Sequence, residues 1–483
     1  MTDHEVKEHL TQLIFERLSS VAGVLSVTLV GSFVDREDLS GISDIDTIVV
    51  CDRLNKKVFD HCLAAVHGIS FKELDINNFQ LKINSSFGPL KFDQPNLVVL
   101  HLMIYDLEGH KRHVTASPFT CFDWERSKHI RGKSLKELFP VGKLQPRDFL
   151  EARRGMENYL EDLKLGSISI REYTFEEDIV SEQEKTHPLD ARHQGEYAFH
   201  IVRNLVLNEI KLKYSLNRLY SISELQDEIQ ELLGDLGEQY IIKFKQLADL
   251  KEQRSTEFPD WTLEWAQEFI KVFQHAFSHK WQSASTVYFL RHAQTSLNDG
   301  TFLGQGRNPG IIKDSVEFHS DLPVKNLYTS PAQRCLETAG FLFPEAQSIP
   351  DDRLLELNYG SAEGLTYSQL RERHPGIIRA WSNGYDPHFP AGGENTAGVL
   401  GRLQSFLSEN ILEKPVSTTA VVSHNVVLRC LLGEAFAIPQ RLWHELVIPH
   451  AKPLEFKMLN GRLYPNLPRT LVSEIFVGLS VVR

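Results

Sequence analysis

Two histidines and two arginines follow short apolar runs in the C-terminal part of the chain. The run VYFL continues directly into Arg291 and His292, the run TTAVVS continues into His424, and the run NLYTSP is soon followed by Arg334. Because the carboxyl ends of parallel strands meet at one edge of an open α/β sheet, we expect these side chains to lie close together. Two guanidinium groups and one imidazole can hold a phosphate dianion, while a second imidazole can attack phosphorus. The sequence therefore predicts a phosphate site at this edge.

A second group of polar residues stands near the N-terminus. The apolar run SVTLV closes on Gly31 and Ser32, and Asp44 and Asp46 open the next run, DIDTIVV. Alternation along a strand places both carboxylates on one face, where a hard divalent cation such as Mg²⁺, bound to substrate phosphates, would offset their charge. A Gly-Ser turn without bulk lets the backbone approach a nucleotide phosphate. These residues predict a site for a metal-bound nucleotide.

The composition excludes several other classes of protein. Of the 483 residues, 42% are hydrophobic and 24% are charged, which argues against a disordered or fibrous chain. The net charge of -12 argues against a nucleic-acid partner and a basic membrane-binding surface. The five cysteines include no C-x-x-C pair, which argues against a disulfide framework and a zinc ribbon. With no signal-peptide pattern and no apolar run of about 18 residues, we expect a cytoplasmic location.

The patterning of the chain predicts an α/β multidomain protein with three domains. Short β-rich runs dominate residues 1–146, which indicates a small α/β domain. Apolar residues recur at spacings of three and four across residues 147–283, which is typical of a helical domain. Strand and helix patterns alternate over residues 284–483, as in a doubly wound parallel sheet.

The C-terminal motifs resemble those of the histidine phosphatase superfamily, also called phosphoglycerate-mutase-like, from residue 286 to about residue 455. The segments RHAQT, SPAQR, LLELNYGSAEG, AGGEN and VVSH occur in the order that the superfamily shows. Ala293 and Gln294 replace the usual Gly-Glu pair of the first motif, but neither stands at the nucleophile position, so we expect activity to survive. The segment between residues 310 and 330 is shortened, which favours hydrolysis over a mutase reaction.

The resemblance implies a role for each motif residue and no cofactor for this domain. His292 would be the nucleophile and form a phosphohistidine, and Glu356 would protonate the leaving oxygen and later deprotonate the hydrolytic water. The phosphoryl oxygens would be held by Arg291, Asn298, Arg334 and His424.

The N-terminal residues resemble the polymerase-beta-type nucleotidyltransferase superfamily over residues 27–50. The resemblance implies that Gly31 and Ser32 bind a nucleotide and that the two following aspartates bind Mg²⁺. That superfamily normally supplies a third carboxylate from a later strand. Asp75 and Asp106 are candidates for it, and His101 stands at the centre of the expected later strand instead.

Together the two resemblances predict a bifunctional enzyme. The C-terminal domain would hydrolyse a small phosphorylated metabolite, and the N-terminal domain would transfer a nucleotidyl group from an NTP to a small acceptor. Two alternatives remain open: the N-terminal domain senses nucleotide or modifies a protein and so gates the phosphatase, or the C-terminal domain is a phosphomutase. The oligomeric state, the nucleotide and the substrates are not indicated by the sequence.

Overall fold

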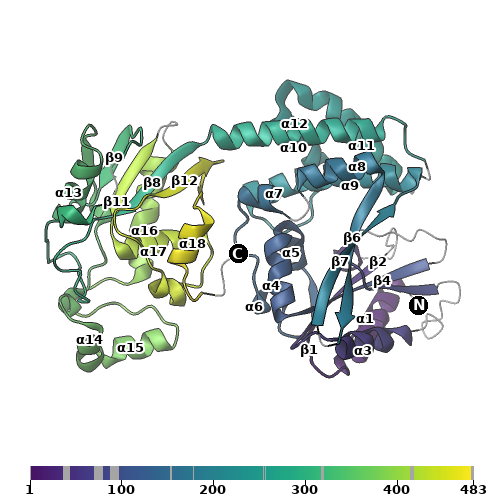
Figure 1. Cartoon of the computed structure of the whole chain (residues 1–483), viewed down its shortest axis with the longest axis horizontal. Helices are drawn as coiled ribbons and strands as arrows, with labels where there is room; N and C mark the ends of the chain where they lie inside the picture. Colours follow the sequence, from purple (N-terminus) through teal and green to yellow (C-terminus); the bar gives the residue numbers. More distant parts are fainter. Residues whose placement is uncertain are drawn as a thin grey trace. The chain divides into compact units, whose positions relative to one another are not determined.

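The computed structural model describes residues 2–35, 44–69, 80–87, 97–152, 155–177, 179–253, 255, 257–316, 320–413 and 418–479. The chain forms two compact units, Met1–Ser278 and His279–Val482, which run from purple to teal and from teal to yellow in Figure 1. The expected boundary at residue 283 lies near the division between the units, whereas the expected boundary at residue 146 lies inside the first unit. The division into three domains therefore stays a prediction.

A five-stranded mixed sheet forms the centre of the first unit, in the strand order β3-β4-β2-β1-β5. β1 is antiparallel to both β2 and β5, whereas β2, β4 and β3 run parallel to one another. The strands are β1 (Val24–Val30), β2 (Asp44–Cys51), β3 (Gln80–Asn84), β4 (Leu97–Asp106) and β5 (Lys128–Gly132).

Two helices bury their apolar faces against this sheet. Ile14 of α1 (Asp3–Ser19) and Val66 of α3 (Lys56–His67) lie in one core with side chains of β1, β2 and β4. Burial of such side chains is the main stabilising contribution in a small α/β layer. The strands and helices give the small α/β arrangement expected for the first part of the chain.

The rest of the first unit is mainly helical. Its further elements are α2 (Ser32–Asp35), α4 (Leu107–Ala116), α5 (Pro118–Trp124), α6 (Leu135–Leu138), α7 (Arg147–Glu151), α8 (Met156–Leu165), β6 (Ser167–Glu176), β7 (Ile179–Pro188), α9 (Ala191–Tyr214), α10 (Ile222–Leu233), η2 (Gly234–Leu236), α11 (Gly237–Glu252) and α12 (Thr262–Gln282). Across the described parts of both units, no helix is long and apolar enough to cross a membrane.

Residues 147–283, for which the sequence predicts a helical domain, also contain the antiparallel hairpin of β6 and β7, which the sequence did not predict. The charged sequence of β7 lacks the apolar alternation that would have predicted a strand. Ion pairs across the hairpin, Arg171–Glu182 and Lys185–Glu172, each measure 2.5 Å between nitrogen and oxygen and link the two strands. Cross-strand charge pairs of this kind stabilise a hairpin without an apolar pattern.

The second unit is built on a six-stranded sheet in the order β10-β9-β11-β8-β12-β13. Its first four strands in this order are parallel, whereas β12 is antiparallel to both β8 and β13. The strands are β8 (Ser285–Arg291), β9 (Asn326–Thr329), β10 (Ser348–Pro350), β11 (Thr419–Ser423), β12 (Leu454–Leu459) and β13 (Arg462–Pro465).

Two separate cores cover the two faces of this sheet. Val421 of β11 lies in one core with side chains of α16 and α17, and its neighbour Val422 lies in the other core with side chains of α13. Helices on both faces are the doubly wound arrangement that the sequence predicts. The helical elements are η3 (Lys313–Ser315), α13 (Gln333–Leu342), η4 (Asp352–Leu354), η5 (Gly360–Ala362), α14 (Tyr367–Arg373), α15 (Pro375–Ser382), α16 (Thr396–Leu407), η6 (Ser408–Leu412), α17 (Asn425–Ala435), η7 (Gln440–Glu445) and α18 (Arg469–Ile475).

We expect Gly360→Ala to destabilise the second unit, because Gly360 has a φ of +53° and an added Cβ would lie 1.8 Å from the carbonyl oxygen of Pro390. The loss in the free energy of unfolding should be about 1–3 kcal/mol, as measured by urea unfolding. Gly376→Ala is the control, because Gly376 is exposed and nothing lies within 4 Å of its added Cβ. Equal stability of the two variants would contradict the prediction.

Candidate active site

The predicted catalytic residues meet at one edge of the sheet in the second unit. β8 pairs in parallel with β11, with Arg291 opposite Ser423, and β11 also pairs in parallel with β9. His292 and His424 directly follow β8 and β11, and their ring centroids lie 5.3 Å apart. The strand pairing therefore brings together two residues that are 132 positions apart in the sequence (424 less 292).

The geometry of His292 fixes which ring nitrogen carries the proton. Its side chain is buried, and Nδ1 lies 2.7 Å from the backbone carbonyl oxygen of Ala293. A carbonyl oxygen only accepts, so Nδ1 must donate the hydrogen bond. The other nitrogen, Nε2, is then left with a lone pair, which is the state that a nucleophile needs.

The surroundings of His292 also keep the ring neutral. Burial lowers the pKa of His292 well below its usual range, and the charges of Arg334 and Arg291 lower this pKa further. The hydrogen bond to Ala293 opposes this shift but does not reverse it. A lowered pKa keeps the lone pair on Nε2 in mildly acidic solution, where an ordinary imidazole is protonated.

Arg334 is held in the site by backbone carbonyl groups. Arg334 is 1% exposed. Its Nη1 donates to the carbonyl oxygen of Arg307 at 3.2 Å, and its Nη2 donates to that of Gly304 at 2.9 Å. Nε donates to Nδ1 of His424 at 3.2 Å. A cation this deeply buried is costly unless its donors are satisfied, and these contacts fix the guanidinium plane beside the two histidines.

Arg291 presents a buried donor to the same site. Nη1 donates to the carbonyl oxygen of Ile448 at 2.9 Å, while the buried Nε has no hydrogen-bond partner among the described residues. Burial lowers the pKa of Arg291 to about 10, which still leaves the guanidinium charged near neutral pH. A buried donor without a protein partner indicates that a ligand supplies the acceptor.

Glu356 has the environment of a general acid. The residue is 4% exposed, and its carboxyl group accepts hydrogen bonds from the backbone N–H groups of Leu357 and Val426. Burial raises the pKa of Glu356, although these contacts and the charges of nearby arginines oppose the shift. A carboxyl group with a raised pKa holds its proton longer as the pH rises, which suits proton donation to a leaving group.

His424 adopts the tautomer opposite to that of His292. Because Nε of Arg334 only donates, Nδ1 of His424 accepts and Nε2 carries the proton. Nε2 therefore donates to Oγ of Ser330 at 2.7 Å. Burial, followed by the charge of Arg334, lowers the pKa of His424 well below its usual range, so the ring is neutral and its one N–H group is directed at Ser330.

Asn298 lies in the loop that follows β8, where it shapes the loop. Its Oδ1 accepts from the backbone N–H and the hydroxyl of Thr295, at 2.8 and 3.1 Å. The oxygen is therefore used inside the loop, and a phosphate contact by the amide N–H groups stays a prediction. Of the two departures from the motif, Ala293 is buried and Gln294 is exposed, and the carbonyl of Ala293 orients His292.

His450 belongs to the site, although the sequence reasoning missed it. Its Nδ1 donates to the backbone carbonyl oxygen of His292 at 2.8 Å, and the two ring centroids lie 5.5 Å apart. Burial, together with the charge of Arg291, lowers the pKa of His450 to about 4. The run LVIPH that precedes β12 is the one signal for it in the sequence, and no spacing links that run to His292.

The comparison with known proteins assigns this site to a family. The sequence profile of the histidine phosphatase superfamily (branch 1) matches residues 287–463. Phosphoserine phosphatase 1 from Hydrogenobacter thermophilus is 33% identical over 162 residues, which cover 30% of this chain and 73% of that protein. The chain belongs to the histidine phosphatase superfamily. The matched residues contain all six of the predicted catalytic and phosphate-binding positions.

The chain is also similar to a bifunctional enzyme and to a solved structure. The 6-phosphofructo-2-kinase/fructose-2,6-bisphosphatase of Caenorhabditis elegans is 31% identical over 165 residues, and this chain spans about a third of it, 35% of its length. The crystal structure of the alpha-ribazole phosphatase from Shigella flexneri is similar with a TM-score of 0.34 and 17% identity, covering 38% of this chain and 95% of that chain.

A second polar cluster lies in the first unit, where the N-terminal motif residues meet. Val30, the last residue of β1, pairs with Asp46 of β2, so the turn at Gly31 lies beside this carboxylate. An added Cβ on Gly31 would lie 2.6 Å from Oδ2 of Asp46, and Gly31 has a φ of +74°. Glycine is thus required here both by the backbone and by the close approach of the carboxylate. Ser32 begins the short helix α2.

His101 occupies the place beside Asp46 in the parallel pairing of β2 with β4. Its Nδ1 lies 2.9 Å from Oδ1 of Asp46, and its Nε2 lies 2.6 Å from the carbonyl oxygen of Ser86. Both partners only accept, so both ring nitrogens donate and the ring is an imidazolium. Burial lowers the pKa of His101, but the hydrogen bond to Asp46 and the charge of that carboxylate outweigh it, and the pKa is raised.

No described candidate for a third metal-binding carboxylate lies beside Asp46 in a state that could bind a metal ion. Asp106 lies at the far end of β4 and caps α4, where it accepts from the backbone N–H of Gly109 at 2.6 Å. Asp75 lies outside the described residues. His101 donates hydrogen bonds and so cannot ligate a cation in this arrangement. Within the described ranges, no group of three or more His, Cys, Asp or Glu side chains could hold a metal ion.

The residues present fit one Mg²⁺ ion with few protein ligands. The burial pattern of β2 leaves Asp44 and Asp46 both half-buried and separated by the buried Ile45, so the two carboxylates share a face. Carboxylate oxygens on one face suit a hard cation that takes its remaining ligands from phosphates and water. Mg²⁺ binding by these residues stays a prediction.

We expect the imidazole of His292 to stay neutral at pH 6, because its lowered pKa means that protonation requires a more acidic solution than it does for a free imidazole. Nitrogen-15 NMR of the ring should show the tautomer protonated at Nδ1, with the signal assigned by its loss in His292→Ala. An imidazolium spectrum for His292 at pH 6 would contradict this expectation.

Proposed function

We propose that the second unit hydrolyses phosphomonoesters through a phosphohistidine formed on His292. The observation that carries this proposal is the hydrogen bond from Nδ1 of His292 to the carbonyl of Ala293, which leaves a lone pair on Nε2. The ring of His424 lies 5.3 Å from that of His292, and the charges of Arg334 and Arg291 act on the His292 ring. Preorganised charges of this kind stabilise the charge that develops on a transferring phosphoryl group.

In the first step, Nε2 of His292 bonds to phosphorus while the bond from phosphorus to the ester oxygen breaks. Glu356 gives its proton to the departing oxygen, which leaves as an alcohol, and becomes a carboxylate. In the second step, this carboxylate takes a proton from water as the water oxygen bonds to phosphorus. The nitrogen–phosphorus bond then breaks, inorganic phosphate leaves, and both residues return to their starting states.

The substrate that we propose is a small phosphorylated metabolite. The relatives include a phosphoserine phosphatase and a fructose-2,6-bisphosphatase, whose names give different substrates for similar sequences. Hydrolysis is favoured over a mutase reaction by the shortened segment between residues 310 and 330, because a mutase must keep the phosphoryl group away from water.

The test of the nucleophile is His292→Ala. Removing the attacking nitrogen should abolish turnover of p-nitrophenyl phosphate and of alkyl phosphates, and should abolish acid-labile labelling of the protein by a phosphorus-32 substrate. His444→Ala is the matched control, because the side chain of His444 is 66% exposed and lies in the same unit. Near-normal turnover in His292→Ala, with retained labelling, would refute the assignment.

Glu356→Gln tests the general acid. The variant should lose far more activity on alkyl phosphates than on p-nitrophenyl phosphate, because an alkoxide needs a proton to leave and a nitrophenolate does not. A loss of about 10²–10⁴-fold is typical for the removal of a general acid. Steady-state kinetics on the two substrates measure the difference, and equal losses on both would exclude proton donation to the leaving group.

We further propose that the first unit binds an NTP with Mg²⁺ and transfers its nucleotidyl group to a small acceptor. The contact of Asp46 with the turn at Gly31 favours this second activity, because it places a carboxylate beside backbone able to approach a phosphate. Mg²⁺ held by Asp44 and Asp46 would offset the charge of the triphosphate. The rival role is a nucleotide sensor or protein-modifying domain that gates the phosphatase, and the imidazolium in place of a third carboxylate favours this rival.

Calorimetric titration with ATP tests this site. Asp44→Asn/Asp46→Asn should abolish the Mg²⁺-dependent binding of ATP and leave phosphatase turnover in EDTA unchanged, because that turnover uses no metal in the proposed mechanism. Asp235→Asn is the control, because Asp235 is exposed and lies in the same unit. ATP affinity that needs no metal and survives the double substitution would refute the proposal. Pyrophosphate release would support transfer, and binding without release would support the sensor.

A further inference from the structure

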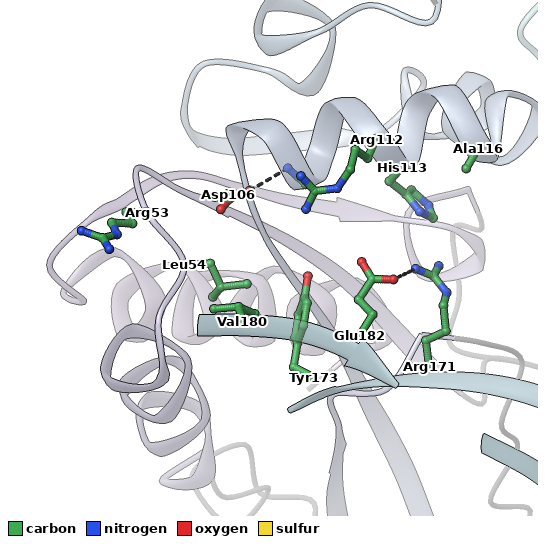
Figure 2. A pocket seen from close by; sticks show the side chains of 11 residues that line it. Arg53, Leu54, Asp106, Arg112, His113, Ala116, Arg171, Tyr173, Val180 and Glu182 are labelled. Atoms are coloured by element: carbon green, nitrogen blue, oxygen red, sulfur yellow. Dashed lines mark hydrogen bonds and ion pairs between the residues drawn. The ribbon is translucent and has the colours of Figure 1, made fainter. Parts of the chain in front are cut away.

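A cavity of about 690 Å³ lies in the first unit, between α4 and the β6–β7 hairpin. Figure 2 shows Tyr173, Glu182 and Arg171 on the hairpin and Arg112 on α4, with the guanidinium of Arg112 directed toward Asp106. Arg53, in the loop after β2, lines the cavity as well. The cavity has the volume of a small-molecule site.

The charges around the cavity favour an anion. Three residues with guanidinium groups, Arg53, Arg112 and Arg171, line the cavity together with two carboxylates, from Asp106 and Glu182. Both carboxylates already accept hydrogen bonds within the protein, one at the start of α4 and the other across the hairpin. The three guanidinium groups exceed the two carboxylates by one positive charge, and their planar donor sets match phosphate oxygens.

Arg171 is held in place before any ligand binds. Its side chain is 12% exposed, and its Nη1 donates to Glu182 at 2.5 Å. The guanidinium carbon lies 5.1 Å from the centre of the Phe87 ring, and the backbones of the two residues exchange hydrogen bonds. A guanidinium fixed on two sides has lost its side-chain entropy already, which favours ligand binding through its remaining donors.

The remaining lining gives room for an organic group. Leu54 and Val180 supply apolar surface, and the ring of Tyr173 is fixed by the hydrogen bond from its hydroxyl to the carbonyl oxygen of Ile104 at 2.8 Å. Inorganic phosphate alone would fill a small part of about 690 Å³. The combination of basic and apolar walls therefore suits a phosphate group that carries a compact organic part.

This cavity is separate from the cluster at Gly31 and Asp46. In the pairing of β2 with β4, His101 stands opposite Asp46, and Asp106 stands opposite Cys51, five residues further along the strand (106 less 101). At about 3.3 Å per residue, the two places lie roughly 16 Å apart along the strands. A ligand in the cavity and a nucleotide at Gly31 would not compete for the same residues.

We propose that this cavity is a second ligand site of the first unit and binds a small phosphorylated metabolite. The phosphate would lie between Arg53 and Arg112, and Arg171 would lie at the base of the cavity. The site is independent of the hydrolysis assigned to the second unit, and none of its lining residues takes part in the proposed catalysis.

The first test is a crystal of the full chain soaked in sodium tungstate, a tetrahedral oxyanion with a strong anomalous signal. Tungstate should appear at His292 in the second unit, which serves as the internal positive control, and also in the cavity. A signal at His292 without one in the cavity would overturn the proposal. Arg53→Ala/Arg112→Ala crystals should lose the cavity signal and keep the other. Arg218→Ala crystals should keep both, because Arg218 is exposed and lies outside the cavity.

The second test uses ribose 5-phosphate on crystals of His292→Ala, in which hydrolysis of the probe is prevented. Density for both the phosphate and the sugar in the cavity would support a phosphorylated metabolite. Density for a bare anion, or an unaltered cavity signal in Arg53→Ala/Arg112→Ala, would overturn it. In solution, the double variant should bind the probe at this site at least tenfold more weakly, whereas Arg218→Ala should bind it normally.

Discussion

The hydrogen bond between the ring of His292 and the carbonyl of Ala293 is the contact on which the phosphatase site depends. It decides that the lone pair of the ring lies on Nε2. The strand pairing of β8 with β11 holds the backbone that supplies this carbonyl, and His450 donates to the next carbonyl, that of His292 itself. Tautomer, ring orientation and strand register thus form one arrangement, and a shift in any of them would turn the proposed nucleophile away.

Burial then sets the protonation of the groups around that nitrogen. Removing His292 and His424 from water keeps both rings neutral, while the same burial raises the pKa of Glu356 and so favours its acid form. Backbone carbonyl groups accept hydrogen bonds from the guanidinium groups of Arg291 and Arg334 and so hold both side chains in the site. The proposed nucleophile, proton donor and cationic clamp can therefore coexist near neutral pH within one buried site.

In the first unit, one residue changes the chemistry that the motif predicts: His101 stands beside Asp46, where the resemblance leads us to expect a third carboxylate. The alternation of Asp44 and Asp46 on one face follows from strand geometry alone, and the structure has it. The pairing of β2 with β4 decides which residue lies beside Asp46. It brings His101, 55 positions away in the sequence, within hydrogen-bond distance of this carboxylate, to which the ring donates. An imidazolium there offsets part of the acidic charge that a metal site would use. The hairpin that closes the cavity on the same unit escaped prediction, because its charged strand has no apolar period.

The sequence by itself predicted the alternation of strands and helices in the second unit, its doubly wound arrangement and six residues of a candidate phosphate site, because apolar period and motif spacing are local properties. Only the tertiary structure decided the tautomers, the shifted pKa values and the presence of His450, which lies 158 positions from His292. It also decided the partner of Asp46 and the gathering of Arg53, Arg112 and Arg171 around one cavity. Such features depend on contacts between distant segments, and on how far each group is removed from water, which no local pattern specifies.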